Sequence, residues 1–156
     1  ENASIIINEA SSNNKKIIIV GNGGSAAISS HVAVDFTKAA GIRAINFNEA
    51  DLITCFANDY GYENWVSEAL KSYSDFGDVI ILISSSGESM NIINAANTAR
   101  DMKNKILTFS GFSSSNSLRS LGDVNFWIDS RSYNYIEMTH HIWLVAICDY
   151  IISVKS

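Results

Sequence analysis

Two short apolar runs, each followed directly by a turn rich in glycine or serine, constrain the fold more than any other feature of the sequence. Ile17–Val20 precedes a first turn, Gly21–Ser25, and Val79–Ile83 precedes a second turn, Ser84–Ser89. Both runs are apolar at every position, which is typical of parallel strands covered on both faces. Because a helical pattern follows each turn, the sequence predicts strand–turn–helix units of an α/β fold.

Further strand and helix patterns alternate along the chain. Additional strands are expected at Arg43–Phe47, Ile106–Phe109 and Val124–Ile128. Helices are expected at Ser25–Lys38, Trp65–Tyr73, Ser89–Met102 and Ser132–Val154. Alternation of this kind favours right-handed crossovers, and it predicts a three-layer sandwich with a five-stranded parallel sheet of the flavodoxin type. Ligands of such sheets bind beyond the carboxyl ends of the strands.

The length, net charge and cysteine content of the chain limit the kinds of protein that it can be. The length of 156 residues suits a single domain, residues 1–156. A net charge of −5 argues against a nucleic-acid partner, which needs a basic face. No apolar run reaches the ~18 residues that span a bilayer, so no membrane association is expected. The opening residues lack a signal-peptide pattern and resemble the end of a helix, so the chain is expected to begin partway into its natural sequence. Two distant cysteines, Cys55 and Cys148, favour reduced thiols and a cytoplasmic location.

The two turns have the chemistry of an anion site. Glycines allow positive φ and close approach of a ligand to the backbone, and the start of a helix offers free amides and a favourable dipole. Alone, the first turn is equally explained as a tight turn, and it satisfies the loose dinucleotide fingerprint but lacks the lysine of a Walker loop. The second turn adds four hydroxyls, although a solvated serine loop remains an alternative. Together the turns favour a compact phosphate with a polyhydroxy tail.

Four motifs resemble those of the SIS (sugar isomerase) domain family, and within it the phosphoheptose isomerases. They are Gly21–Ala27 followed by His31, Phe56–Tyr62, Ile83–Ser89 and Thr108–Gly111, and they occur in order between about residues 17 and 151. The resemblance implies isomerisation of sedoheptulose 7-phosphate to a mannoheptose 7-phosphate for lipopolysaccharide or capsule synthesis. It also implies a homotetramer with sites between subunits, a zinc ion, and N-terminal helices of which this chain retains a stub.

Carried over residue by residue, the resemblance implies a substrate-binding set in the two turns and in the middle motif. This set is Asn22, Gly23, Gly24, Ser25, Asn58, Asp59, Ser84, Ser85, Ser86 and Ser89.

His31 and Asp35 form the first candidate group for catalysis. Isomerisation through an enediol needs an acid/base near C1 and C2 of the sugar. The two side chains lie four residues apart on one predicted helix and therefore share a face, which suits metal ligands, a base with its orienting partner, or an ordinary surface pair. The family carries Glu where this chain has Asp35.

The C-terminal helix carries the second candidate group. Matching the family's pattern on Ile136 assigns Glu137 to a Gln ligand and His140 to the nearer histidine, whereas the farther histidine falls on Val145. The expected catalytic residues are Asp35, Glu137 and His140, and the expected zinc ligands are His31, Asp35 and Glu137. His141 is an alternative to the missing histidine, because it is one turn from Glu137.

Two functions compete at this point. The first is an active phosphosugar isomerase, favoured by the retained carboxylates and His31. The second is a non-catalytic SIS module that binds a phosphosugar, favoured by Val145. A dinucleotide-binding protein is a third reading, against which the serine-rich second turn argues.

Overall fold

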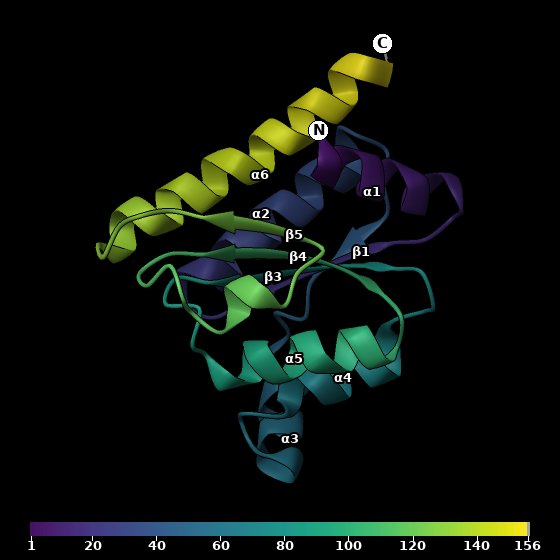
Figure 1. The fold of residues 1–156 in the computed structure, drawn as a ribbon. Coiled ribbons are helices and arrows are strands. Elements are labelled where there is room, and N and C mark those ends of the chain that lie inside the picture. Colours follow the sequence, from purple (N-terminus) through teal and green to yellow (C-terminus); the bar gives the residue numbers. More distant parts are fainter. Residues whose placement is uncertain (156) are drawn as a thin grey trace.

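A parallel sheet of five strands lies between two layers of helices in the computed structural model, which describes residues 1–155 (Figure 1). The strands are β1 (Ile17–Gly21), β2 (Ala44–Ile45), β3 (Val79–Ser84), β4 (Lys105–Ser110) and β5 (Val124–Trp127). Their order is β2-β1-β3-β4-β5 and every neighbouring pair is parallel. The predicted flavodoxin-type sandwich is confirmed.

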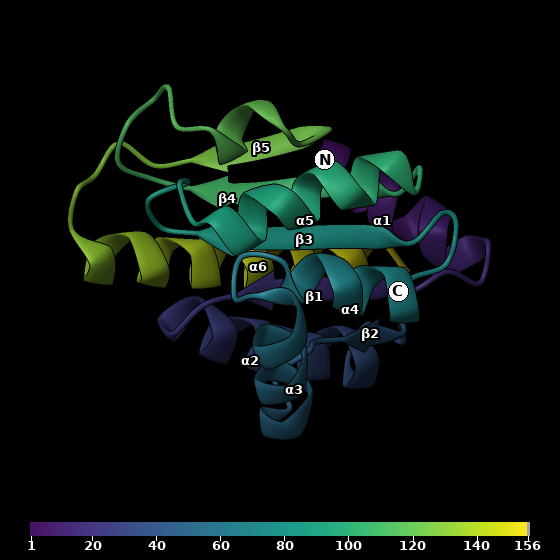
Figure 2. The ribbon, with the colours of Figure 1, turned by 90° about the horizontal axis from the view of Figure 1, so that it is seen from below.

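The helices divide between the two faces of the sheet (Figure 2). One face is covered by α1 (Asn2–Ser12), α2 (Gly24–Lys38) and α6 (Tyr133–Lys155). The other is covered by α3 (Ala50–Tyr60), α4 (Trp65–Tyr73), α5 (Met90–Asp101) and the short η1 (Leu118–Ser120). Across residues 1–155, no helix combines the length and the apolarity that crossing a bilayer requires.

Side chains along the buried strands point alternately to the two faces of the sheet and pack into two hydrophobic cores, one on each face. Ile17 and Ile19 of β1 pack toward Phe36 of α2, whereas Ile18 packs toward Trp65 of α4. Every residue of β1 and β3 is buried, which explains why Ile17–Val20 and Val79–Ile83 are apolar at every position. These two central strands are the ones that end in the predicted anion turns.

Helix α3 was not among the helices predicted from the sequence. None of its residues is fully buried, and only one side, with Leu52, Ile53 and Phe56 partly buried, contacts the core around α4. These apolar residues recur at helical spacing, so a signal for this helix is present in the sequence. β2 is shorter than predicted, since the chain leaves the sheet after Ile45 and directs Phe47 into the α4 core.

Candidate functional site

The first and second turns meet at the carboxyl edge of the sheet. β1 and β3 are hydrogen-bonded neighbours, and Gly21 at the end of β1 pairs with Ile83 of β3. The chain then leaves β1 toward α2 on one face and leaves β3 toward α5 on the other face. This divergence makes the β1/β3 junction the topological switch point, where ligands of such sheets bind.

A cavity of about 120 Å³ lies at this junction. It is lined by both turns and by the start of α6: Asn22, Ser25, Ile83, Ser84, Ser85, Ser86, Ser89, Tyr133 and Glu137. Its volume is well below the ~300–1,000 Å³ of pockets that enclose drug-sized ligands. The cavity therefore suits a small anionic group, such as a phosphate, rather than a whole sugar phosphate.

Backbone amides and serine hydroxyls of the second turn are joined by hydrogen bonds. The Gly87 amide donates to Ser84 Oγ (3.2 Å), and Ser84 Oγ donates to Ser89 Oγ (3.0 Å). The Glu88 amide donates to Ser86 Oγ (3.2 Å). The buried Ser85 Oγ has no partner among the described residues. Because the hydroxyls of Ser85, Ser86 and Ser89 keep a hydrogen to donate, the turn can supply several hydrogen bonds to an anion.

Asn91 joins the two turns and was not predicted from the sequence. Asn22 Nδ2 donates to Asn91 Oδ1 (2.9 Å), and Asn91 Nδ2 donates back to Asn22 Oδ1 (2.8 Å). Tyr62 Oη donates to the same Asn22 oxygen (3.2 Å). Asn91 is only 2% exposed, and these bonds satisfy its buried amide; no local pattern in the sequence marks this residue. The Asn22 side chain thus holds the turns together, and its backbone remains for a ligand.

Glu137 lies against the start of α2. A Cβ added to Gly24 would overlap the carboxylate of Glu137, so only glycine permits this approach. The preceding Gly23 has φ +56°, a conformation that also favours glycine. The carboxylate is stabilised there by the positive end of the α2 dipole. The structure thus places Glu137 in the cavity beside Gly24 of the first turn.

His31 and Asp35 lie farther along α2 and do not line the cavity. His31 Nε2 and Asp35 Oδ2 are 3.0 Å apart, and both side chains are exposed. The ring of His141 on α6 lies edge-on to that of His31, with centroids 4.7 Å apart. The structure therefore gathers His31, Asp35 and His141 into one cluster between α2 and α6, and none of the three lines the cavity that contains Glu137.

The donors present in one chain do not fit a zinc centre. Zinc needs three or four ligands converging at about 2.0–2.3 Å. Among residues 1–155, no group of three or more His, Cys, Asp or Glu side chains is arranged to hold a metal. The expected ligands His31, Asp35 and Glu137 belong to two separate places, as described above.

His140 lies away from the other candidates, contrary to the expectation that groups it with Asp35 and Glu137. It is fully buried, and its Nε2 lies 3.1 Å from the carbonyl oxygen of Ser110. Its position follows the buried stripe of α6, which continues through Ile136, Leu144, Cys148 and Ile151. Since a carbonyl oxygen can only accept, Nε2 carries the hydrogen. Of the two neighbouring histidines, His141 is the one that reaches His31.

Burial of His140 makes the protein sensitive to acid. Loss of hydration lowers the pKa of His140 to about 4, although the hydrogen bond to Ser110 opposes the shift. The unfolded chain, with a pKa near 6.5, takes up a proton first as the pH falls. The stabilisation is therefore complete above pH ~6.5 and is lost toward pH ~4, lowering the free energy of unfolding by about 3 kcal/mol. Urea denaturation at several pH values should show this slope, and His140→Leu should flatten it; an unchanged slope in that variant would contradict the assignment.

Asn58 and Asp59 lie at the end of α3, outside the cavity. Asn58 Nδ2 donates to Asp59 Oδ1 (2.8 Å), and both side chains are exposed. In Figure 1, α3 projects away from the sheet. The contact between this region and the first turn is made instead by Tyr62, three residues farther along the chain.

Comparison with known proteins identifies the family of this chain. The sequence model of the SIS domain matches residues 1–111. Phosphoheptose isomerase from Mycobacterium tuberculosis is 32% identical over 134 residues, covering 81% of this chain and 67% of that protein. Phosphoheptose isomerase from Buchnera aphidicola is 31% identical over 116 residues, covering 74% of this chain. The chain spans 60% of the length of that Buchnera relative.

Solved structures show the same fold. The phosphoheptose isomerase of Neisseria gonorrhoeae superposes with a TM-score of 0.90 at 29% identity, covering 97% of this chain and 83% of that one. The enzyme of Francisella tularensis gives a TM-score of 0.88 at 24% identity, covering 96% and 82%. With the family model matching most of the chain, the chain belongs to the SIS domain family.

Proposed function

We propose that this chain is a phosphosugar isomerase of the phosphoheptose type, acting on sedoheptulose 7-phosphate to give a mannoheptose 7-phosphate. The observation that carries the proposal is the convergence of both anion turns on one small cavity that also contains the carboxylate of Glu137. The names of its relatives support the substrate class. Such a product would serve lipopolysaccharide or capsule synthesis in the cytoplasm.

The proposed chemistry assigns separate tasks to the two parts of the cavity. The hydroxyls and amides of the second turn bind the phosphate. A base removes the C1 proton of the ketose to form an enediol and returns it to C2, while the hydroxyl hydrogen moves from O1 to O2. Glu137 is the proposed base because its carboxylate is the one that lines the cavity. The cluster of His31, Asp35 and the half-buried His141 lies on the same two helices, α2 and α6, that border the cavity.

No step of this proposal passes through zinc. Of the ligand set expected from the resemblance, Glu137 lines the cavity and His31 and Asp35 do not, and residues 1–155 of one chain bring no three donors together. The proposed proton transfer therefore uses side chains alone.

A non-catalytic phosphosugar-binding module is the second candidate. It is favoured by Val145, which stands where the resemblance expects a histidine, and by the absence of His31, Asp35 and His141 from the lining of the cavity. Purified protein incubated with sedoheptulose 7-phosphate, with and without added zinc, separates the two. Formation of an aldose phosphate supports the isomerase. Binding without turnover under both conditions supports the module and contradicts the isomerase.

Ser86→Ala should weaken binding of the sugar phosphate by roughly tenfold or more. Ser86 lines the cavity, and its Oγ already accepts from the Glu88 amide, so its hydrogen is available to the phosphate. A lost hydrogen bond to a charged group costs ~1.5–3 kcal/mol. Calorimetric titration measures the change, with Ser153→Ala on the distant end of α6 as control. Equal affinities of the Ser86 variant and the parent would remove Ser86 from the site.

We expect a homo-oligomer, most simply a homotetramer, because α6 and α2 leave apolar side chains exposed. The exposed residues are Val34, Tyr135, Met138, Ile142, Tyr150 and Val154. Those on α6 include an i, i+3, i+7 series, so they share a face that a second copy can cover. Light scattering should give a mass near four chains, and Ile142→Glu should reduce it. A parent that is monomeric at micromolar concentration would contradict this expectation.

A further inference from the structure

Glu88 belongs to the second turn, yet its carboxylate is turned outward and fully engaged by another loop. The Ser117 amide donates to Glu88 Oε1 (2.8 Å), and Ser117 Oγ donates to Glu88 Oε2 (2.8 Å). Both partners come from the β4–η1 loop, residues 111–117, which is 29 residues away in sequence. A carboxylate held by two donors has a fixed direction, and this one is absent from the lining of the cavity.

The same loop and the first residue of η1 also contact the backbone of the second turn. The Leu118 amide donates to the carbonyl oxygen of Gly87 (3.0 Å), and the Gly111 amide donates to that of Ser85 (2.9 Å). The carboxamide of Asn116 packs directly against Gly87, where an added Cβ would overlap it. These contacts bind the backbone of the turn, whereas Glu88 supplies the side-chain bond on its outer side.

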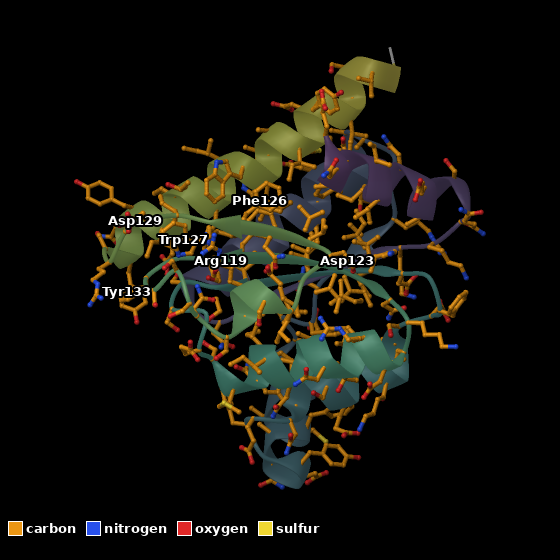
Figure 3. All side chains as sticks on the ribbon, viewed as in Figure 1. Arg119, Asp123, Phe126, Trp127, Asp129 and Tyr133 are labelled. Carbon is orange, nitrogen blue, oxygen red and sulfur yellow. The ribbon has the colours of Figure 1, made fainter. Side chains whose placement is uncertain are left out.

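The β4–η1 loop is itself anchored, so it can act as a support. Asn116 is 3% exposed, and its Oδ1 accepts from the Arg119 amide (3.0 Å). The Arg119 guanidinium lies over the ring of Trp127 on β5, 4.6 Å from its centroid (Figure 3). A cation over an aromatic face is attractive, and this contact ties the segment that carries Ser117 to the edge strand.

We propose that Glu88 is a positioning residue of the anion site: its two bonds to Ser117 fix the second turn and direct the carboxylate away from the bound phosphate. The inference rests on the proposed phosphate role of the turn. If Glu88 were free to turn toward the cavity, it would add a second carboxylate beside Glu137 and increase the repulsion of an anion. Held outward, the same charge sits at the start of α5, where the helix dipole favours it.

The proposal predicts weaker anion binding when Glu88 is removed, whereas simple charge repulsion predicts tighter binding. If Glu88 acted only through its charge, removing that charge would tighten anion binding in every variant. If Glu88 positions the turn, the variant that loses the bonds binds more weakly, although it also loses a negative charge. Glu88→Ala loses both the bonds and the charge, whereas Glu88→Gln loses the charge and keeps an acceptor for Ser117.

Titration of the full chain with inorganic phosphate tests this directly. We expect Glu88→Ala to weaken phosphate binding about three- to tenfold, in line with the loss of one or two hydrogen bonds. Glu88→Gln should bind within twofold of the parent or more tightly, and Ser117→Ala should weaken binding about two- to threefold. Asp101→Ala, at the exposed far end of α5, removes one negative charge as a control and should bind as the parent does.

A double-variant cycle adds a readout that general destabilisation would not give. Glu88→Ala with Ser117→Ala should lose little more affinity than Glu88→Ala alone, because the two residues act through one contact. Phosphate binding by Glu88→Ala that equals or exceeds the parent's overturns the proposal, as does strict additivity in the cycle. A parent that binds inorganic phosphate but turns over no sugar contradicts the isomerase and leaves the positioning role of Glu88 supported by these ratios.

Discussion

Replacing Glu137 with Gln should lower the isomerisation rate by about 10²–10⁴-fold, the usual cost of removing a general base. Glu137 is the carboxylate in the cavity, where it lies beside Gly24 and between the two turns. Gln keeps the size and the packing against Gly24 but cannot take a proton. Binding of the sugar phosphate should therefore persist while turnover is lost, and steady-state kinetics should show the change in kcat rather than in KM.

Asp149→Asn is the matched control for that change. Asp149 lies on the exposed side of the same helix, α6, and carries the same charge away from the cavity. Its variant should isomerise as the parent does. If Glu137→Gln retains the parental rate, Glu137 is not the base, and the base must lie in the cluster of Asp35, His31 and His141.

Gly87→Ala should abolish most phosphate binding, with an expected loss of about 100-fold or more. Gly87 has φ +70°, and a Cβ there would overlap the Asn116 carboxamide. Asn116 cannot yield easily, because its Nδ2 donates to Ser110, Gly111 and Ser113 within a buried site. The second turn must then move, and it loses several hydrogen bonds to the anion, each worth ~1.5–3 kcal/mol. Titration with inorganic phosphate measures the loss.

Gly41→Ala separates this collision from the general cost of the backbone conformation. Gly41 has a similar φ of +65°, but no atom lies within 4 Å of the position that a Cβ would occupy. The control should lose only ~1–2 kcal/mol of unfolding free energy and keep its phosphate affinity. Equal binding by Gly87→Ala and Gly41→Ala would show that contact with Asn116 does not shape the turn.

The fold was predictable because its central strands are buried on both sides. Ile17–Val20 and Val79–Ile83 are apolar at every position, and a glycine- or serine-rich turn follows each of them directly, so strand, turn and helix could be assigned in order. α3 was not predicted, although Leu52, Ile53 and Phe56 recur at helical spacing, because no glycine- or serine-rich turn precedes it to mark its start.

The contents of the cavity were partly predictable for a related reason. Ser84, Ser86 and Glu137 follow from motifs whose place at a strand or helix end fixes where they point. The Asn22–Asn91 pair depends on how two helix starts face each other across 69 residues, which no local pattern encodes. His140 and His141 are adjacent in sequence but lie about 100° apart around a helix, so a one-residue choice decides between core and cluster.

Calorimetric titration of the parent protein with sedoheptulose 7-phosphate, alongside the same sugar without its phosphate, tests the central claim most directly. The hydroxyls and amides that converge at the β1/β3 junction are there, in this account, to hold the phosphate. The phosphorylated sugar should bind at least 100-fold more tightly, since several charge-assisted hydrogen bonds depend on that group. Equal affinity for the two sugars, or no binding of either, would contradict the account.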